Sequence, residues 1–320
     1  MILGVNPDMS SRVTRLAPSP TGALHLGNLR TFLVNWAMAR RGGWSIVMRL
    51  EDLDGPRIKP GAIEATIDTL RWVGLDWDGP ICIQSHDLQP YVEAMHQLAH
   101  LRRTYPCELT RSEIQAAASA PHGREGETPF PAVLRPSSIP SRFADANTNW
   151  RFIVEDRTIE FADAFVGPIV RHPSRECGDF VIWTRRAQPS YQLAVVIDDA
   201  RQRVTDVVRG DDLIDSAARQ MLLIEALSLG TPPRYAHLPL VVGEDGRRLA
   251  KRHGDTRVDH YRTMGVTPQR LIGLIGFWCG LSRARSTMTL DEFRDALDLS
   301  MIPRGKTVFT HEDHQWLCER

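Results

Sequence analysis

The chain alternates between short apolar runs and apolar residues at helical spacing. Residues 13–17 and 44–50 are short, mostly apolar runs, which predict two buried strands. Apolar residues recur at helical spacing between 25 and 40, and Gly42-Gly43 supplies the glycine that commonly follows a helix. A strand, a helix and a second strand in this order predict the βαβ unit of a parallel, doubly wound sheet.

The middle of the chain combines two predicted helices with a segment of different amino-acid composition. Amphipathic spacing predicts helices over residues 60–74 and 88–102. From 104 to 141 the composition shifts to Ala, Pro, Ser and Gly, which predicts a loosely built insertion and the least ordered part of the chain. Short apolar runs then predict a hairpin within 150–161 and a strand at 179–183.

The sheet is predicted to resume after this insertion. Apolar runs at 191–197, 204–208 and 235–242 predict three further core strands. Between the last two, a helix is predicted from a cap at Asp215 to about residue 229.

These elements predict an α/β fold, a Rossmann-like doubly wound parallel sheet with an inserted α+β subdomain and a short C-terminal helical region. The sheet belongs to a catalytic domain that is built from two separate segments of the chain. The predicted divisions are residues 1–103 and 190–257 for the catalytic domain, 104–189 for the insertion and 258–320 for the helical region.

The composition narrows the class of protein. Lys+Arg and Asp+Glu both number 39, so the net charge is near zero, which excludes a protein that coats nucleic acid non-specifically but allows a local basic face. The five cysteines are scattered without a CxxC pair, which favours a reducing compartment over a disulfide framework. No leader pattern or membrane-length apolar run occurs, so we expect a soluble cytoplasmic protein with no membrane partner.

Residues 14–28 combine the features of a phosphate site. The first strand stops at the prolines around Ser19, a turn follows at Gly22, and a helix begins near His25. Backbone N–H groups at a helix N-terminus bind anions, and the His25 ring can donate to phosphate oxygens. Gly22 and Gly27 allow a nucleotide to approach the backbone closely. The alternative is an ordinary junction between a strand and a helix.

Polar residues follow or begin three of the predicted strands. Glu51, Tyr191 and Arg209 would lie where ligands collect in doubly wound sheets. Glu51 could receive a ligand ammonium group, although acidic residues are also common in plain loops. Arg209 could bind a small polar ligand or pair structurally with Asp211 or Asp212.

A cationic loop follows the last predicted core strand. Residues 244–257 contain Lys251 among several arginines and glycines, which suits transient stabilisation of a charged phosphoryl group. Runs of charge are more often solvated surface, which is the alternative for this loop.

Two distant motifs together resemble the paired signatures of class I aminoacyl-tRNA synthetases. They are Arg15 to Gly27 (RLAPSPTGALHLG) and Arg248 to Arg252 (RLAKR). The first motif is similar to that of the glutamyl-type enzymes. Four further stretches support the same resemblance: Met48–Asp54, Tyr191–Asp199, Val207–Leu213 and His237–Leu240. The resemblance covers about residues 12–257 in the order that the family shows.

Glutamyl-tRNA synthetases carry a large helical anticodon-binding region after the loop that holds the second motif. Here that lysine loop is the cationic loop 244–257, and the sequence ends too soon after it to hold such a region. The chain therefore resembles the short glutamyl-Q branch of the family. That resemblance implies activation of L-glutamate with ATP and Mg²⁺, and transfer of the glutamyl group to the queuosine base in the anticodon of tRNA(Asp).

The resemblance also implies roles for individual residues. The residues implied to hold glutamate are Arg15, Ser19, Glu51, Tyr191 and Arg209. The residues implied to bind ATP are His25, Gly27 and Lys251, with His25 and Lys251 also acting in catalysis. Arg209 is our candidate for the receptor of the glutamate side-chain carboxylate, because a planar guanidinium can donate two parallel hydrogen bonds.

The sequence departs from the family pattern in three places, one of which is Arg252-His253-Gly254, more like the full-length glutamyl enzymes than the short branch. The lysine loop has Arg248 and Ala250 where the family usually has Lys and Ser, so Lys251 is left as the key cation. Relatives in the short branch often bind zinc through a C-x-C pair, a Tyr and a later Cys, but here Leu109 replaces the second Cys of the pair. Cys107 with His122 is a poor substitute for four ligands, so we expect no metal site and no zinc.

Two alternatives remain at this point. One is a glutamyl-tRNA synthetase catalytic domain that charges a conventional tRNA 3′ end. The other is a tRNA-binding paralogue without catalytic activity, which the altered lysine loop allows. Nothing in the sequence demands more than a monomer.

Overall fold

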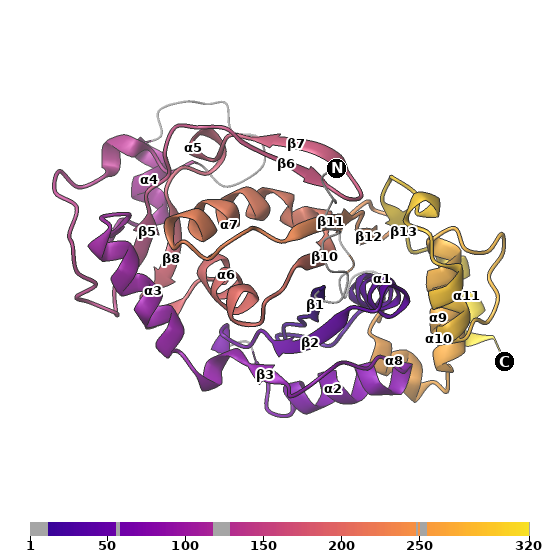
Figure 1. Cartoon of the computed structure of the whole chain (residues 1–320). Helices are drawn as coiled ribbons and strands as arrows, with labels where there is room; N and C mark the ends of the chain where they lie inside the picture. The colour runs from indigo at the N-terminus through magenta and orange to yellow at the C-terminus, as the bar shows by residue number, and fades with distance from the viewer. Residues whose placement is uncertain (1–11, 56–57, 118–128, 248, 250–254, 320) are drawn as a thin grey trace, which may run out of the picture.

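The computed structural model describes residues 12–55, 58–117, 129–247, 249 and 255–319. Its elements run along the chain as a mixed α/β fold (Figure 1). The strands are β1 Val13–Leu16, β2 Ser45–Leu50, β3 Cys82–Ile83, β4 Thr104–Pro106, β5 Trp150–Phe152, β6 Ile159–Asp163, β7 Gly167–Arg171, β8 Phe180–Thr184, β9 Gln188–Pro189, β10 Asp206–Gly210, β11 Arg234–Leu238, β12 Val241–Val242 and β13 Thr307–Val308. The helices are α1 Leu26–Gly42, α2 Ala62–Val73, α3 Gln89–His100, α4 Arg111–Ala117, α5 Pro173–Glu176, α6 Tyr191–Arg201, α7 Ile214–Ala226, α8 Val258–Thr263, α9 Pro268–Trp278, α10 Leu290–Ala296 and α11 His311–Cys318.

The centre of the molecule is parallel sheet, as the sequence predicted. β1, β2 and β3 pair in parallel, and so do β10, β11 and β6. The two groups meet at β1 and β10, where the backbone N–H of Thr205 donates to the carbonyl of Val13 at 2.8 Å. The carboxyl ends of β1 and β10 therefore lie side by side, which places Arg15 near Arg209 across the middle of the sheet.

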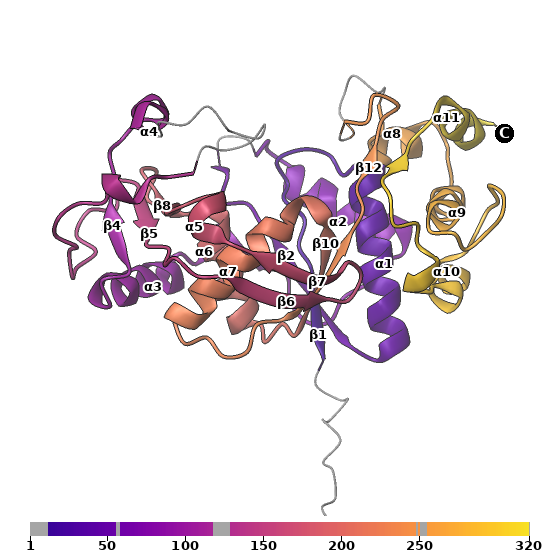
Figure 2. The same ribbon diagram turned by 90° about the horizontal axis from the view of Figure 1, so that it is seen from above.

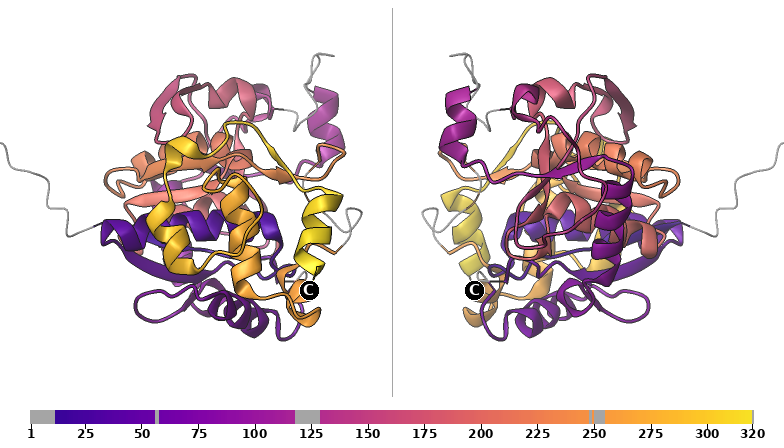
Figure 3. Two further views of the ribbon diagram at one scale, coloured as in Figure 1. Left: turned by 90° about the vertical axis from the view of Figure 1, so that its right-hand side faces the viewer. Right: turned by 90° about the vertical axis from the view of Figure 1, so that its left-hand side faces the viewer.

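Helix α1 follows the first strand for a local reason and packs into the main core. Its caps are His25 and Gly43, and a glycine adopts the left-handed backbone of Gly43 (φ 66°) without strain, so the predicted glycine stop is confirmed. The C-terminal helices share the same apolar cluster as α1, including Leu33 from α1, Leu274 from α9 and Phe293 from α10, all fully buried. The end views show these helices covering α1 (Figure 3).

The insertion lies at the opposite end of the molecule from the C-terminal helices (Figure 2). Strands β4, β5, β8 and β9 form a sheet of their own. The predicted hairpin within 150–161 is wrong, because β5 pairs with β4 and β8, whereas β6 pairs with β7 and β11. Both strands exist, but their partners are distant in sequence, and local patterning carries no information about such partners.

The largest correction concerns residues 191–197, which form most of helix α6 and not a strand. All residues from 193 to 199 are buried, so the helix is buried around most of its circumference, and residues 193–197 are a continuous apolar run. A helix buried on all sides shows the same continuous apolar run as a buried strand. Packing against α3 and α7 overrides the strand preference of Val195 and Val196.

Two smaller predictions also need correction. Helix α7 begins at Ile214 after Leu213, so Asp215 lies in its first turn and is not the cap. The single strand expected over 235–242 is divided into β11 and β12 around Pro239, which cannot donate a ladder hydrogen bond. No helix among the residues described is long and apolar enough to cross a membrane.

Candidate active site

The turn between β1 and α1 forms a preorganised helix N-terminus. His25 is the N-cap of α1, and its Nδ1 accepts from the backbone N–H of Asn28 at 3.3 Å. This contact leaves the ring proton of neutral His25 on Nε2. A Cβ at position 27 would lie 3.2 Å from the His25 ring and 3.3 Å from Val241, so Gly27 allows both residues to pack closely. The structure therefore combines a helix N-terminus, a glycine and a histidine at one point.

Backbone hydrogen bonds join the first signature motif to residues 256–258, at the far end of the cationic loop. The N–H of Leu26 donates to the carbonyl of Thr256 at 3.1 Å, and the N–H of Val258 donates to the carbonyl of Leu24 at 2.8 Å. The far end of the cationic loop is thus attached to the opening turn. Lys251 itself lies outside the described residues.

One cavity of about 460 Å³ collects the predicted site residues. Its lining includes seven of the eight that the sequence analysis named: Arg15, Ser19, His25, Gly27, Glu51, Tyr191 and Arg209. They come from β1, the turn before α1, the end of β2, the start of α6 and β10. The cavity therefore lies at the carboxyl ends of parallel strands, where doubly wound sheets bind their ligands.

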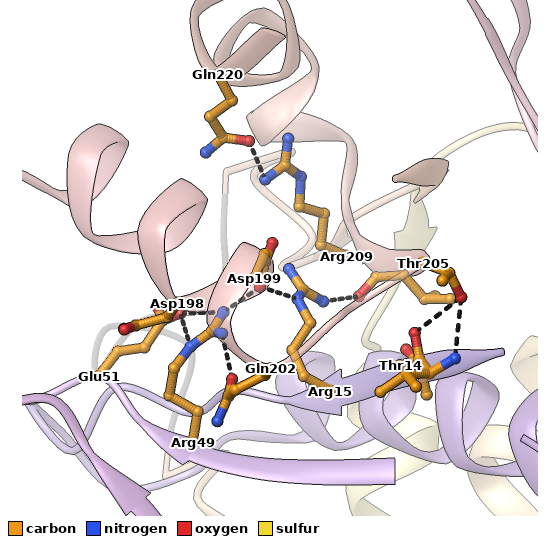
Figure 4. Close-up of polar contacts among 12 residues, drawn as sticks. Thr14, Arg15, Arg49, Glu51, Asp198, Asp199, Gln202, Thr205, Arg209 and Gln220 are labelled. Atoms are coloured by element: carbon orange, nitrogen blue, oxygen red, sulfur yellow. Dashed lines mark hydrogen bonds and ion pairs between the residues drawn. The ribbon is translucent and has the colours of Figure 1, made fainter. Parts of the chain in front are cut away.

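A buried carboxylate connects two arginines beneath this cavity (Figure 4). Asp199 Oδ1 lies 2.7 Å from Arg49 Nη2 and 3.6 Å from Arg15 Nε. Arg49 is fully buried, also donates to Gln202 Oε1 at 2.7 Å, and lies 3.4 Å from Glu51 Oε1. This ion network fixes the positions of Arg15 and Glu51, because each arginine has a charged partner on its inner side.

Arg209 is held by three hydrogen bonds within the protein. It donates from Nε to His237 Nε2 at 3.0 Å, from Nη1 to Gln220 Oε1 at 2.9 Å and from Nη2 to the carbonyl of Leu213 at 3.2 Å (Figure 4 shows the contact with Gln220). Arginine has five N–H groups, so one on each terminal nitrogen remains to bind a ligand. The structure shows these three bonds to uncharged groups, and no ion pair with Asp211 or Asp212 is seen among the described residues.

Sequence reasoning missed the residues that support the site. Arg49, Asp199 and Gln220 were given no role, although all are buried and polar. A helical reading of α6 would have identified Asp199, because it lies eight residues after Tyr191 and therefore on the same helix face. No local pattern points to Gln220, whose contact with Arg209 depends on how α7 packs against β10.

Glu51 gives the site a specific response to pH. Burial raises the pKa of Glu51 above its ordinary value of 4.5, and Arg49 and Arg15 only partly oppose this shift. If ionised Glu51 receives the ammonium group of glutamate, protonation of Glu51 competes with binding. We expect the Kd for L-glutamate, measured by calorimetry, to rise as the pH is lowered from 7 towards 5. An unburied glutamate side chain, whose pKa is about 4.3, would stay mostly ionised in that range, so the expected pH dependence comes from the raised pKa of Glu51.

The control for this prediction is Glu51→Gln. The variant should bind glutamate weakly at every pH and lose the dependence between pH 7 and 5. A wild-type Kd that stays constant over this range would contradict the assigned role of Glu51.

The side chains around Cys107, where relatives in the short branch often bind zinc, are mostly apolar in the structure. Cys107 and Leu109 pack in a small cluster with Tyr105, Ile114 and Phe130. Among the residues described, no group of three or more His, Cys, Asp or Glu side chains could hold a metal ion. The partner suggested by the sequence, His122, lies outside the described residues, so the absence of zinc stays a prediction.

A family model described as the catalytic domain of class I tRNA synthetases (E and Q) matches residues 12–316. The chain belongs to this family. Membership of this family agrees with the Rossmann-like sheet and with a cavity at the carboxyl ends of its strands.

Relatives of this class I synthetase carry two kinds of name. A protein of Rhodopirellula baltica called "Glutamyl-Q tRNA(Asp) synthetase" is 45% identical, and the alignment covers 94% of this chain and 97% of that protein. A protein of Maricaulis maris called "Glutamate--tRNA ligase 2" is 38% identical over 81% of this chain and 53% of that protein. The crystal structure of a glutamate-tRNA synthetase from Elizabethkingia anophelis is similar to this chain with a TM-score of 0.77 at 26% identity, over 96% of this chain and 70% of that one.

Proposed function

We propose that this synthetase activates L-glutamate with ATP and transfers the glutamyl group to queuosine in the anticodon of tRNA(Asp). The observation that carries the proposal is Arg209, a buried guanidinium in the cavity with one N–H left on each terminal nitrogen. A side-chain carboxylate is the ligand that suits this fork. Four relatives named glutamyl-Q tRNA(Asp) synthetase, at 41–45% identity against 33–38% for three named glutamate--tRNA ligase, support the choice of acceptor.

The remaining cavity residues suit the other groups of glutamate. Arg209 binds the side-chain carboxylate, and Glu51 and Tyr191, which line the same cavity, hold the ammonium group. Arg15 in β1 and Ser19 in the turn that follows β1 also line the cavity and would bind the α-carboxylate. This arrangement would direct the α-carboxylate towards the N-terminus of α1, where His25 and Gly27 bind the phosphates of MgATP.

Activation then follows from positioning and charge stabilisation. An oxygen of the glutamate α-carboxylate attacks the α-phosphorus of MgATP, the bond to the β-phosphate breaks, and pyrophosphate leaves with its charge balanced by Mg²⁺ and Lys251 and with a hydrogen bond from His25. A hydroxyl of the queuosine cyclopentene ring next attacks the acyl carbon, loses its proton and releases AMP. Mg²⁺ enters with ATP as part of the substrate. The protein needs to supply only geometry and charge for both steps.

A second cavity leaves room for the acceptor. It has a volume of about 570 Å³ and shares Ser19, Glu51 and Tyr191 with the first. Its other wall carries Arg185 and Arg186 from the turn between β8 and β9 in the insertion. Both arginines are exposed and suit the phosphates of a nucleic acid that enters beside the adenylate.

The division of labour follows the predicted domains. Residues 1–103 and 190–257 would perform activation, residues 104–189 would contact the tRNA, and residues 258–320 would support α1. We also propose that the protein is a monomer, acts in the cytoplasm and binds no zinc.

The test compares tRNA acceptors in the presence of ATP and labelled L-glutamate. We expect label on tRNA(Asp) that contains queuosine, and none on tRNA(Asp) that contains guanine at the same position. Equal labelling of the two would contradict the proposed acceptor. Label on tRNA(Glu) alone would favour a conventional glutamyl-tRNA synthetase. Absence of glutamate-dependent exchange between ATP and pyrophosphate would contradict activation itself.

A further inference from the structure

A buried histidine on β11, the strand next to β10, contacts the Nε side of the Arg209 guanidinium. His237 is fully buried on β11 and lies directly opposite Arg209 in the parallel pairing of β10 and β11. Its Nε2 accepts from Arg209 Nε at 3.0 Å. Arginine can only donate, so Nε2 must carry a lone pair, and the ring proton of neutral His237 must be on Nδ1.

Asp163 holds this proton in place. Its Oδ2 lies 2.7 Å from His237 Nδ1, and its Oδ1 accepts from the backbone N–H groups of Phe165 at 2.9 Å and Val166 at 2.8 Å. The backbone N–H of His237 also donates to both carboxylate oxygens. These backbone donors fix the carboxylate, so that one oxygen always faces the imidazole ring.

The charges of the two groups agree with this arrangement. Burial lowers the pKa of His237, and nearby Arg209 lowers it further, so the ring stays neutral despite the opposing effect of Asp163. Burial pushes the pKa of Asp163 upward, but hydrogen bonds from His237 and from the backbone outweigh burial and hold this pKa below its ordinary value. A charged Asp163 therefore faces a neutral ring that is protonated at Nδ1.

We propose that Asp163 and His237 are positioning residues that orient Arg209 by fixing the tautomer of the histidine. The inference rests on the proposed function, in which Arg209 receives the glutamate side-chain carboxylate. With Nε occupied by His237, the two terminal nitrogens present their remaining N–H groups to the ligand. The ring of Tyr235 adds a second constraint, because the guanidinium carbon lies over it at 5.1 Å.

Substituting Asp163→Asn reverses the tautomer with little change of shape. The Asn carbonyl oxygen is expected to keep the donors from Phe165 and Val166, which leaves the Asn amino group opposite His237 Nδ1. That amino group donates, so the ring proton moves to Nε2 and faces the N–H of Arg209. Two donors then oppose each other, and the guanidinium must leave its position.

The control is Asp206→Asn in the same sheet. Asp163 and Asp206 are each only 4% exposed, but Asp206 accepts from Arg12, Thr205 and Arg234 and has no contact with Arg209. Both variants remove a buried carboxylate charge. Only the substitution at 163 alters the support of Arg209.

The experiment measures two properties of the full chain. Calorimetry gives the Kd for L-glutamate without ATP or tRNA, and long-range ¹H–¹⁵N NMR identifies the protonated nitrogen of His237. We expect Asp163→Asn to raise the Kd at least tenfold and to move the proton from Nδ1 to Nε2, while Asp206→Asn leaves the Kd within twofold. His237→Phe should also raise the Kd tenfold or more, and it carries the test if Asp163→Asn does not fold.

The outcomes separate this inference from the proposed function. If wild-type protein binds glutamate and a folded Asp163→Asn binds it equally well, the positioning role is overturned while the proposed substrate stands. An equal loss of affinity in Asp206→Asn would also overturn it, since any buried carboxylate would then matter. If the wild-type protein does not bind glutamate, the proposed function fails first.

Discussion

Replacing Arg209 with lysine is expected to raise the KM for glutamate in ATP–pyrophosphate exchange by about 100-fold. Truncating one partner of a buried, hydrogen-bonded charge pair costs about 2–5 kcal/mol, and about 2.7 kcal/mol corresponds to two factors of ten. Lysine keeps the positive charge but has no planar fork. Its three N–H groups are also too few for His237 Nε2, Gln220 Oε1, the carbonyl of Leu213 and both oxygens of a carboxylate, in a site where Arg209 is only 5% exposed.

Arg234→Lys is the matched control for this substitution. Arg234 begins the neighbouring strand β11, pairs with Asp206, and has a side chain that is 62% exposed. The same change of chemistry should therefore leave the KM for glutamate unchanged. An Arg209→Lys enzyme with a wild-type KM would show that the side-chain carboxylate binds elsewhere in the cavity.

Replacing Arg49 with methionine is expected to lower the free energy of unfolding by about 3–5 kcal/mol, the range seen when one partner of a buried ion pair is removed. Arg49 is fully buried, and its loss leaves Asp199 with only the 3.6 Å contact to Arg15. Glu51 would lose its neighbouring cation as well. Urea denaturation followed by circular dichroism measures the change.

A half-buried arginine whose acidic partners are exposed provides the comparison. Arg40 pairs with Asp76 and Asp78, whose side chains are 66% and 50% exposed, so Arg40→Met should cost at most about 1 kcal/mol. Adding Asp199→Asn to Arg49→Met should recover part of the lost stability, because it removes the uncompensated charge. If Arg49→Met is no less stable than Arg40→Met, the ion network does not hold the site together.

Much of the site could be predicted because its residues occur next to strong local signals. Ser19 and His25 flank a turn between a strand and a helix, and Glu51 directly follows a continuous apolar strand. Parallel strands bring such positions to one edge of the sheet, so a correct order of elements is sufficient to bring them together. The shared cavity follows from this topology.

The supporting residues could not be predicted, because each depends on contacts between distant segments. Asp163 was assigned to the insertion, yet β6 pairs with β11 at Tyr235, which brings its carboxylate to His237. The buried helix α6 was read as a strand because its apolar run has no exposed face to show a helical period. That error also hid the relation between Tyr191 and Asp199.

The most direct test of the account is the chemical position of the transferred glutamate. After reaction with ATP, L-glutamate and queuosine-containing tRNA(Asp), the RNA is digested to nucleosides and analysed by mass spectrometry. The account predicts that queuosine gains the mass of one glutamyl group and that the 3′-terminal adenosine is unchanged. Glutamate on the terminal adenosine, with unmodified queuosine, would contradict it.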